Sequence, residues 1–253
     1  MRQGICVEDH DGIAVARLAH GKVNALDIEL CQAITTTMHA NADADAIVLT
    51  GTGSVFSAGV DLHRLRNSEA DYVAEFLPAL DEAFLAVFET PRPVVAAING
   101  HALAGGCLLA AACDLRLMSA GTIGVTELPV GLPFPLAGLE IMRHAFGPAT
   151  NHLVITAAKL DPPTAHRRGI IDELTTATEL LPRALARART LGAIPHATYA
   201  LTKKQLHRPV GHLIDHGKAC GEHEQITAAW TSPTAHAAID AYLDTLTTRR
   251  RTS

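Results

Sequence analysis

Residues 101–114 read HALAGGCLLAAACD, an apolar run of small residues in the middle of a 253-residue chain. Together with RPVVAAING before it, the run approaches the length of a membrane-spanning helix, about twenty residues. Asn99, Gly100 and the glycine pair 105–106 interrupt it. The stretch therefore predicts a buried strand over 93–98, a turn, and a short buried helix over about 106–112.

The glycine pair lies at the start of that predicted helix. A helix start presents unpaired N–H groups and a positive dipole end, and glycine lets a ligand approach this backbone without an intervening side chain. The pair is equally consistent with a helix that packs closely against its neighbours. At this point both interpretations stay open.

The composition is that of a globular protein, with 48% hydrophobic and 19% charged residues. A net charge of −5 argues against general nucleic-acid binding. The five cysteines are scattered without ligand spacing, so we expect reduced thiols and no metal. The charged N-terminus MRQGICVEDHDG lacks the apolar core of an export signal, so we expect a cytoplasmic protein.

Strand patterns alternate with helical ones along the first three quarters of the chain. Strands are predicted over 12–20, 45–50, 93–98 and 114–119, and Asp27 is predicted to cap a helix with one apolar face. A long helix is expected over 68–90, with a possible kink at Pro78. After 168–174 the pattern is helical almost to the end. The sequence thus predicts an α/β core over 1–192 and a helical region over 193–253 that supports self-association.

Two familiar motifs are incomplete. The sequence 51–53, GTG, opens like a dinucleotide fingerprint, but Phe56 stands where the third glycine should be. Ser57 lacks the preceding glycine of a nucleophile elbow, because position 55 is Val. What remains is the small turn Ala58-Gly59, a second site of accessible backbone N–H groups. Two such sites are what an oxyanion hole needs to hold a carbonyl oxygen as it gains charge.

Four segments share an order and spacing that resemble the enoyl-CoA hydratase/isomerase (crotonase) superfamily: GKVNALD (21–27), FSAGVDL (56–62), NGHALAGGCLLAAACDLRL (99–117) and GVTELPVGLPF (124–134). The resemblance implies a ClpP-like spiral core of ββα units with a C-terminal helical region for trimerisation. It implies a homotrimer or hexamer that binds an acyl-CoA thioester. Coenzyme A would be part of the substrate, with no further cofactor, no metal, no nucleic acid and no membrane partner.

Carried over residue by residue, the resemblance makes the amides of Ala58 and Gly105 the oxyanion donors. The substrate-binding positions would be Lys22, Asn24, Ala25, Leu26, Gly59, Asp61, Gly106 and Leu108. Lys203 and Lys204 of a neighbouring subunit would be available to the coenzyme A phosphates. His63 and His101 lie near enough in sequence to line the pocket, but we assign neither a chemical role.

The carboxylates decide which reaction is expected. Hydratases of this superfamily have a first glutamate three residues after the oxyanion-hole glycine, where this chain has Leu108, while the second is present as Glu127. One carboxylate suffices to move a proton from C2 to C4 of a 3-enoyl thioester. The motif is similar to that of Δ3,Δ2-enoyl-CoA isomerases, so Glu127 is the predicted proton shuttle. Glu140, expected on a helix face beside Arg143, is a second candidate acid.

Two alternatives stay open. A hydratase would need another group, such as Glu140 or a histidine, to position the water. A non-catalytic acyl-CoA-binding protein would keep the pocket without the chemistry. The sequence does not specify the acyl chain length, the pathway, or trimer against hexamer.

Overall fold

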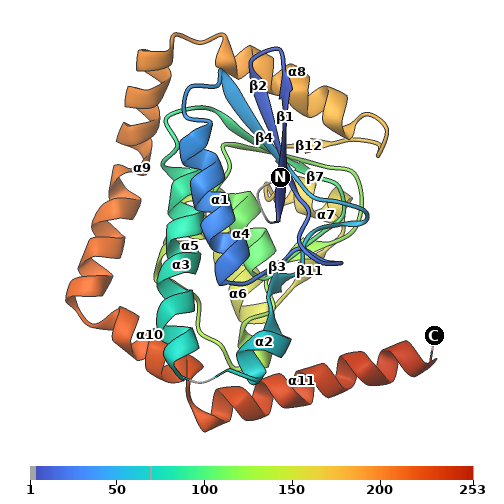
Figure 1. Ribbon diagram of the computed structural model, residues 1–253, viewed down its shortest axis with the longest axis vertical. Helices are drawn as coiled ribbons and strands as arrows, with labels where there is room; N and C mark the ends of the chain where they lie inside the picture. The colour runs from blue at the N-terminus through green and yellow to red at the C-terminus, as the bar shows by residue number, and fades with distance from the viewer. Residues whose placement is uncertain (1–3, 69, 253) are drawn as a thin grey trace.

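A computed structural model describes residues 4–68 and 70–252, and its architecture confirms the predicted α/β fold class (Figure 1). The main sheet has six strands in the order β1-β2-β4-β7-β9-β12. Its bounds are β1 Ile5–His10, β2 Ile13–Leu18, β4 Ala46–Thr50, β7 Val94–Ile98, β9 Leu115–Met118 and β12 Glu173–Leu174. All neighbours are parallel except the β1-β2 pair.

That antiparallel hairpin was not predicted. It turns at Asp11-Gly12, where both residues have positive φ, 56° and 85°. An Asp-Gly pair between two apolar runs is a strong short-range hairpin signal, because both central positions of a type I′ turn require positive φ. The sequence therefore did contain the information for β1.

Helices cover both faces of the main sheet, which explains the near-continuous apolar strands. On one face, α8 (Leu180–Gly192) packs Leu180, Ala184 and Ala188 on the strands. On the other face lies the larger core cluster, to which α1 (Ile28–Ala40), α3 (Ala70–Phe88) and α4 (Gly105–Ala111) contribute. Figure 1 shows α1, α3 and α4 lying together on that side.

Helices α1 and α3 follow the sequence patterns. The Asp27 carboxylate accepts the Leu30 N–H at 2.8 Å, confirming the predicted N-cap of α1. Helix α3 runs continuously through Pro78 instead of stopping there. Proline removes the hydrogen bond to the carbonyl of Ala74, and both residues are exposed, so water can satisfy that oxygen.

Two small sheets flank the main one. The first has the order β11-β10-β8-β5, and the second pairs β3 with β6 in parallel. The strands are β3 Ala25–Leu26, β5 Val55–Ser57, β6 Gly59–Val60, β8 His101–Leu103, β10 Ile123–Gly124 and β11 Lys159–Leu160. Such short strands carry no periodic signal and were not predicted. In the first of these sheets, β8, which precedes the glycine pair, is hydrogen-bonded to β10, which follows α4.

The chain ends in three helices, α9 (His196–Ala219), α10 (Glu222–Trp230) and α11 (Pro233–Thr252). Val210, Ile214, Trp230 and Ile239 belong to the same hydrophobic cluster as the core. Helix α11 crosses beside α2 at the lower edge of Figure 1. The C-terminal helices therefore pack on their own chain. The remaining helices are α2 Leu62–Arg66, η1 Leu128–Val130, α5 Leu136–Phe146, α6 Ala149–Thr156 and α7 Pro162–Arg167.

Within residues 4–68 and 70–252 no helix is long and apolar enough to cross a membrane. Over the same residues, no group of three or more His, Cys, Asp or Glu side chains is placed to hold a metal ion. The five cysteines are unbridged, and three of them, Cys31, Cys107 and Cys113, are buried.

Candidate active site

A cavity of about 440 Å³ collects the predicted site residues. Its lining includes Ala25, Ala58, Asp61, Gly105, Leu108 and Glu127. These residues come from four sequence segments that the short strands and α4 bring together. The cavity is therefore the candidate active site.

Close backbone approach explains the glycines around this cavity. Gly59 has φ of +88°, and a Cβ there would lie 2.6 Å from the Ala104 Cβ and 3.0 Å from the Gly105 nitrogen. A Cβ on Gly106 would collide with the carbonyl of Ser57. Strand β6 thus runs directly against the start of α4. The packing interpretation of the glycine pair is therefore supported at Gly106, while the donor role of the Gly105 amide stays a prediction.

Gly105 is the first residue of α4, so its N–H has no partner inside the helix. Ala104 before it has φ of 50° and ψ of −126°, a conformation that glycine adopts far more easily. Ala104 is therefore strained in this conformation.

The Ala58 amide does not fit its predicted role. Its N–H donates to the Val23 carbonyl oxygen at 3.0 Å, so this donor is already engaged. The Asp61 N–H likewise donates to Leu26 of β3, at 3.0 Å. Successive N–H groups of an extended strand point to opposite edges, so the Val60 N–H points away from β3. Val60 lines the cavity, which makes its amide the better candidate for the second donor.

Glu127 is almost completely buried, with 6% of its surface exposed. It precedes η1, and its carboxylate accepts the Thr126 N–H at 2.6 Å. Burial raises the pKa of Glu127 to about 7, although hydrogen bonds from the Thr126 and Glu127 backbone act in the opposite direction. A carboxyl group with this pKa exchanges a proton readily near neutral pH.

Leu108 occupies the position of the absent first glutamate and is 1% exposed. A Cβ on Gly138 of α5 would overlap the Leu108 side chain, so this glycine makes room for the leucine. Glu140 is buried on α5 and pairs with Arg143 at 2.5 Å, as expected from its helical spacing. Glu140 does not line the cavity, so it is not placed to act as a second acid there.

Four of the predicted substrate-binding residues, Asn24, Leu26, Gly59 and Gly106, do not line the cavity. The Asn24 side chain donates to the Phe56 carbonyl at 3.1 Å and accepts the His20 N–H at 2.9 Å. Leu26, Gly59 and Gly106 are buried behind the lining. Asp61 lines the cavity and also caps α2, accepting the Arg64 N–H at 3.0 Å.

Two histidines were predicted to lie near the pocket. His63 lines the cavity, and His101 does not. The His101 ring is exposed and lies 3.0 Å from the Thr122 hydroxyl. Lys22 is exposed and outside the lining. Lys159, which sequence reasoning missed, is the lysine that lines the cavity.

The C-terminal helices supply the residues that sequence reasoning missed entirely. Trp230 of α10 and Tyr242 and Leu243 of α11 line the cavity. Trp230 is 1% exposed, and its indole N–H donates to the Pro133 carbonyl at 2.8 Å. A lone tryptophan in a helical segment carries no signal for a site more than 90 residues earlier in the sequence.

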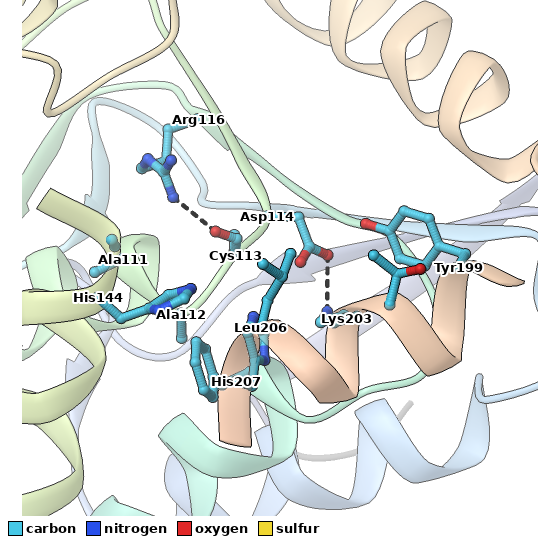
Figure 2. A pocket seen from close by; sticks show the side chains of 13 residues that line it. Ala111, Ala112, Cys113, Asp114, Arg116, His144, Tyr199, Lys203, Leu206 and His207 are labelled. Carbon is cyan, nitrogen blue, oxygen red and sulfur yellow. Dashed lines mark hydrogen bonds and ion pairs between the residues drawn. The ribbon is translucent and has the colours of Figure 1, made fainter. Parts of the chain in front are cut away.

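A second cavity, of about 330 Å³, lies between the end of α4, α5 and α9 (Figure 2). Two of its charged side chains have partners within the protein. Figure 2 shows the Lys203 ammonium beside Asp114, at 2.8 Å, and the Arg116 guanidinium donating to the Cys113 carbonyl, at 2.7 Å. Burial lowers the pKa of His207 to about 3, which keeps it neutral. Lys203 is therefore not available to a phosphate, which corrects that prediction, whereas Lys204 stays exposed.

Comparisons with known proteins agree with this geometry. The enoyl-CoA hydratase/isomerase family model matches residues 8–247. A probable enoyl-CoA hydratase of Mycobacterium leprae is 29% identical over 81% of each chain. The mitochondrial enoyl-CoA delta isomerase 1 of Mus musculus is 28% identical, over 78% of this chain and 71% of that protein.

Solved structures give the same result for the fold. The human mitochondrial delta3-delta2-enoyl-CoA isomerase superposes with a TM-score of 0.92 at 23% identity, over 98% of this chain and 99% of that one. A probable enoyl-CoA hydratase of Mycobacterium tuberculosis superposes with a TM-score of 0.83 at 30% identity, over 90% and 98%. With this fold and a family match that spans nearly the whole chain, the protein belongs to the enoyl-CoA hydratase/isomerase family of the crotonase superfamily.

Proposed function

We propose that the protein is an isomerase that shifts the double bond of a 3-enoyl-CoA to give the conjugated 2-enoyl-CoA. One observation carries the proposal: among the described residues, Glu127 is the only buried carboxylate that lines the cavity. Asp61, the other carboxylate in the lining, is partly exposed and caps α2. A single shuttling base is enough for isomerisation.

The proposed reaction uses the residues as follows. The Glu127 carboxylate takes a proton from C2, and the electron pair delocalises onto the thioester oxygen as a dienolate. The N–H groups of Gly105 and Val60 hold that oxygen, with the positive end of α4 adding to the effect. Glu127 then returns the proton to C4. No water enters or leaves, and coenzyme A serves only as part of the substrate.

Hydration is the second candidate, supported by relatives named as hydratases. Adding water benefits from two groups that hold and activate it. The buried Leu108 side chain supplies neither a donor nor an acceptor, and Gly138 fits it closely. A carboxylate at position 108 would be buried among apolar atoms. Binding without catalysis is the third candidate, and the raised pKa of Glu127 argues against it.

We also propose that the protein acts as a homotrimer or hexamer in the cytoplasm. Support comes from Leu201, Leu206 and Leu213 of α9, each at least half exposed in the single chain. Apolar side chains grouped on one helix are typical of a subunit contact.

The test is to supply a 3-enoyl-CoA and a 2-enoyl-CoA separately, following the absorbance of the conjugated thioester and the product mass. An isomerase raises the absorbance from the 3-enoyl substrate without a change in mass. Glu127→Gln should lower the rate about 10²-fold or more, while the affinity for a saturated acyl-CoA stays within about twofold. The glutamine keeps the size of the side chain but cannot accept the proton.

Three results would contradict the proposed reaction or the role of Glu127 in it. A 2-enoyl substrate that gains the mass of water, with no turnover of the 3-enoyl substrate, would establish a hydratase. Turnover that survives Glu127→Gln would show that another group is the base. Binding of the saturated acyl-CoA with neither reaction would leave the non-catalytic alternative.

A further inference from the structure

The cavity lining has two unlike parts. Its polar side chains include Asp61, His63 and Lys159, which are partly or fully exposed. Six of its apolar side chains are buried and come from α3, the segment after Glu127 and the C-terminal helices: Leu80, Phe84, Val130, Leu132, Trp230 and Leu243. The polar part of the lining therefore reaches solvent, whereas these six apolar side chains do not.

This asymmetry orients a thioester. Given the proposed function, on which this inference rests, the carbonyl lies beside Gly105 and Glu127. The charged coenzyme A arm has to lie on the solvent-exposed side of the cavity, because burying its phosphates without charged partners costs a large free energy. The acyl arm is then left to contact the buried apolar lining. Trp230 consequently contacts the acyl chain and not the coenzyme A arm.

Trp230 is held in place from two sides. Its indole N–H donates to the Pro133 carbonyl at 2.8 Å, and its ring packs on Phe76 with centroids 6.2 Å apart. Pro133 belongs to the loop that follows Glu127, and its neighbour Leu132 lines the cavity. Swinging the ring away would break the hydrogen bond and leave the carbonyl unpaired. The indole is therefore a fixed wall.

We propose that Trp230 closes the acyl end of the cavity and sets the longest acyl chain that the protein accepts. At about 30 Å³ for each water-sized group, the cavity of about 440 Å³ holds about fifteen non-hydrogen atoms, shared between the end of the coenzyme A arm, the thioester and the acyl chain. The preferred substrates are thus short- to medium-chain thioesters, with about ten acyl carbons or fewer. Longer chains meet the indole ring.

The experiment measures kcat/KM for a series of 3-enoyl-CoA substrates from six to sixteen carbons. The unchanged protein should lose at least about tenfold in kcat/KM over two to four carbons beyond its limit, since each excluded methylene forfeits a burial worth about three- to fourfold. Trp230→Ala removes the ring and should move this limit outward by about four carbons. Trp230→Phe, which keeps most of the apolar packing, should move it by less.

Phe76→Leu is the matched control. Phe76 packs on Trp230 but does not line the cavity, so this change loosens the same cluster without lengthening the pocket. Its chain-length limit should move less than that of Trp230→Ala, because the indole ring and its hydrogen bond to Pro133 remain. A limit that stays fixed in a folded Trp230→Ala, or in Trp230→Phe if the alanine variant does not fold, overturns the proposal. So does an equal shift in Phe76→Leu.

Failure of the proposed function gives a different result. If no 3-enoyl-CoA is isomerised, the Kd of saturated acyl-CoAs over the same lengths replaces kcat/KM. An affinity limit that moves more in Trp230→Ala than in Phe76→Leu supports Trp230 as the end wall even then. An unchanged affinity limit overturns it independently of any reaction.

Discussion

Glu127 shows how one residue acquires its chemistry from its surroundings. The sequence places it in an apolar segment, and the fold buries it beside Leu108 at the start of α4. Burial penalises the charged form more than the backbone N–H of Thr126 favours it, so the pKa rises to about 7. The carboxyl group is thus divided between its two protonation states near neutral pH.

This shift predicts the pH dependence of the reaction. The base must be deprotonated to take the C2 proton, so kcat/KM should be constant above about pH 8 and fall about tenfold per unit well below pH 7. If the base had the pKa of an unperturbed glutamate, kcat/KM would stay constant down to about pH 4.5. Initial rates from pH 5 to 9 measure the midpoint.

Asp81→Asn is the control for that profile. Burial raises the pKa of Asp81 to about 6, but its carboxylate accepts the Ala137 N–H at 3.1 Å and does not line the active-site cavity. In this variant the midpoint of the fall in kcat/KM at low pH should therefore be the same as in the unchanged protein. A midpoint near pH 4.5 in the unchanged protein would contradict the role given to burial.

At the scale of elements, the loop that carries Glu127 is held by α11. Glu127 precedes η1, whose turn closes at Gly131 with φ of 73°. A Cβ on Gly131 would lie 3.0 Å from the Ala238 Cβ and 3.5 Å from the Ala235 Cα of α11. Helix α11, which was predicted to support self-association, therefore also packs against the loop that carries Glu127.

Gly131→Ala should accordingly affect catalysis as well as stability. The left-handed backbone costs an alanine about 1–2 kcal/mol, and the new methyl group presses the loop away from α11. We expect kcat to fall about tenfold with a smaller change in KM, because a displaced base affects the chemical step more than binding. Steady-state kinetics and urea unfolding of the same preparation measure both effects.

Gly169→Ala separates the cost of the left-handed backbone from the effect of the methyl group on the contact with α11. Gly169 also has positive φ, 70°, but a Cβ there would meet nothing within 4 Å. This variant should lose similar stability and keep its kcat. Equal kcat values for the two variants would show that contact with α11 does not position Glu127.

For the whole molecule, the docking of α9 depends on a buried ion pair. The Lys203 ammonium lies 2.8 Å from the Asp114 carboxylate and 3.3 Å from the Arg92 carbonyl, and Lys203 is 6% exposed. Asp114 also accepts the Val94 N–H at 2.7 Å, so the pair joins α9 to the edge of β7 and β9. Removing one partner leaves the other charge buried and uncompensated.

Lys203→Ala should therefore lower the free energy of unfolding by about 3 kcal/mol, as measured in urea. The KM for acyl-CoA should change by less than about twofold, because Lys203 lies outside the active-site cavity. Lys204→Ala, the exposed neighbour, should cost less than about 0.5 kcal/mol. A Lys203→Ala variant of normal stability and weakened acyl-CoA binding would restore the phosphate-binding role.

The sequence by itself determined the parts that depend on local patterns and on short motifs. The Asp27 cap, the apolar face of α1, the strand before the glycine pair and the helix after it follow from periodicity and from the conformational preferences of a few residues. The motifs placed Gly105, Leu108 and Glu127 at one site, and the single carboxylate followed from their residue types. The Asp11-Gly12 pair is also a local pattern that indicates the hairpin of β1 and β2.

The tertiary structure decided what depends on long-range contacts. The direction and pairing of each amide depend on the fold, because the Ala58 N–H donates to the Val23 carbonyl whereas the Val60 N–H points away from β3. Lys203 has no phosphate role because Asp114, far away in sequence, neutralises it. Trp230 reaches the cavity only because α10 packs back on α3. A sequence pattern reports on neighbours along the chain, whereas hydrogen bonding, burial and the end of a cavity are set by residues that meet only in the folded protein.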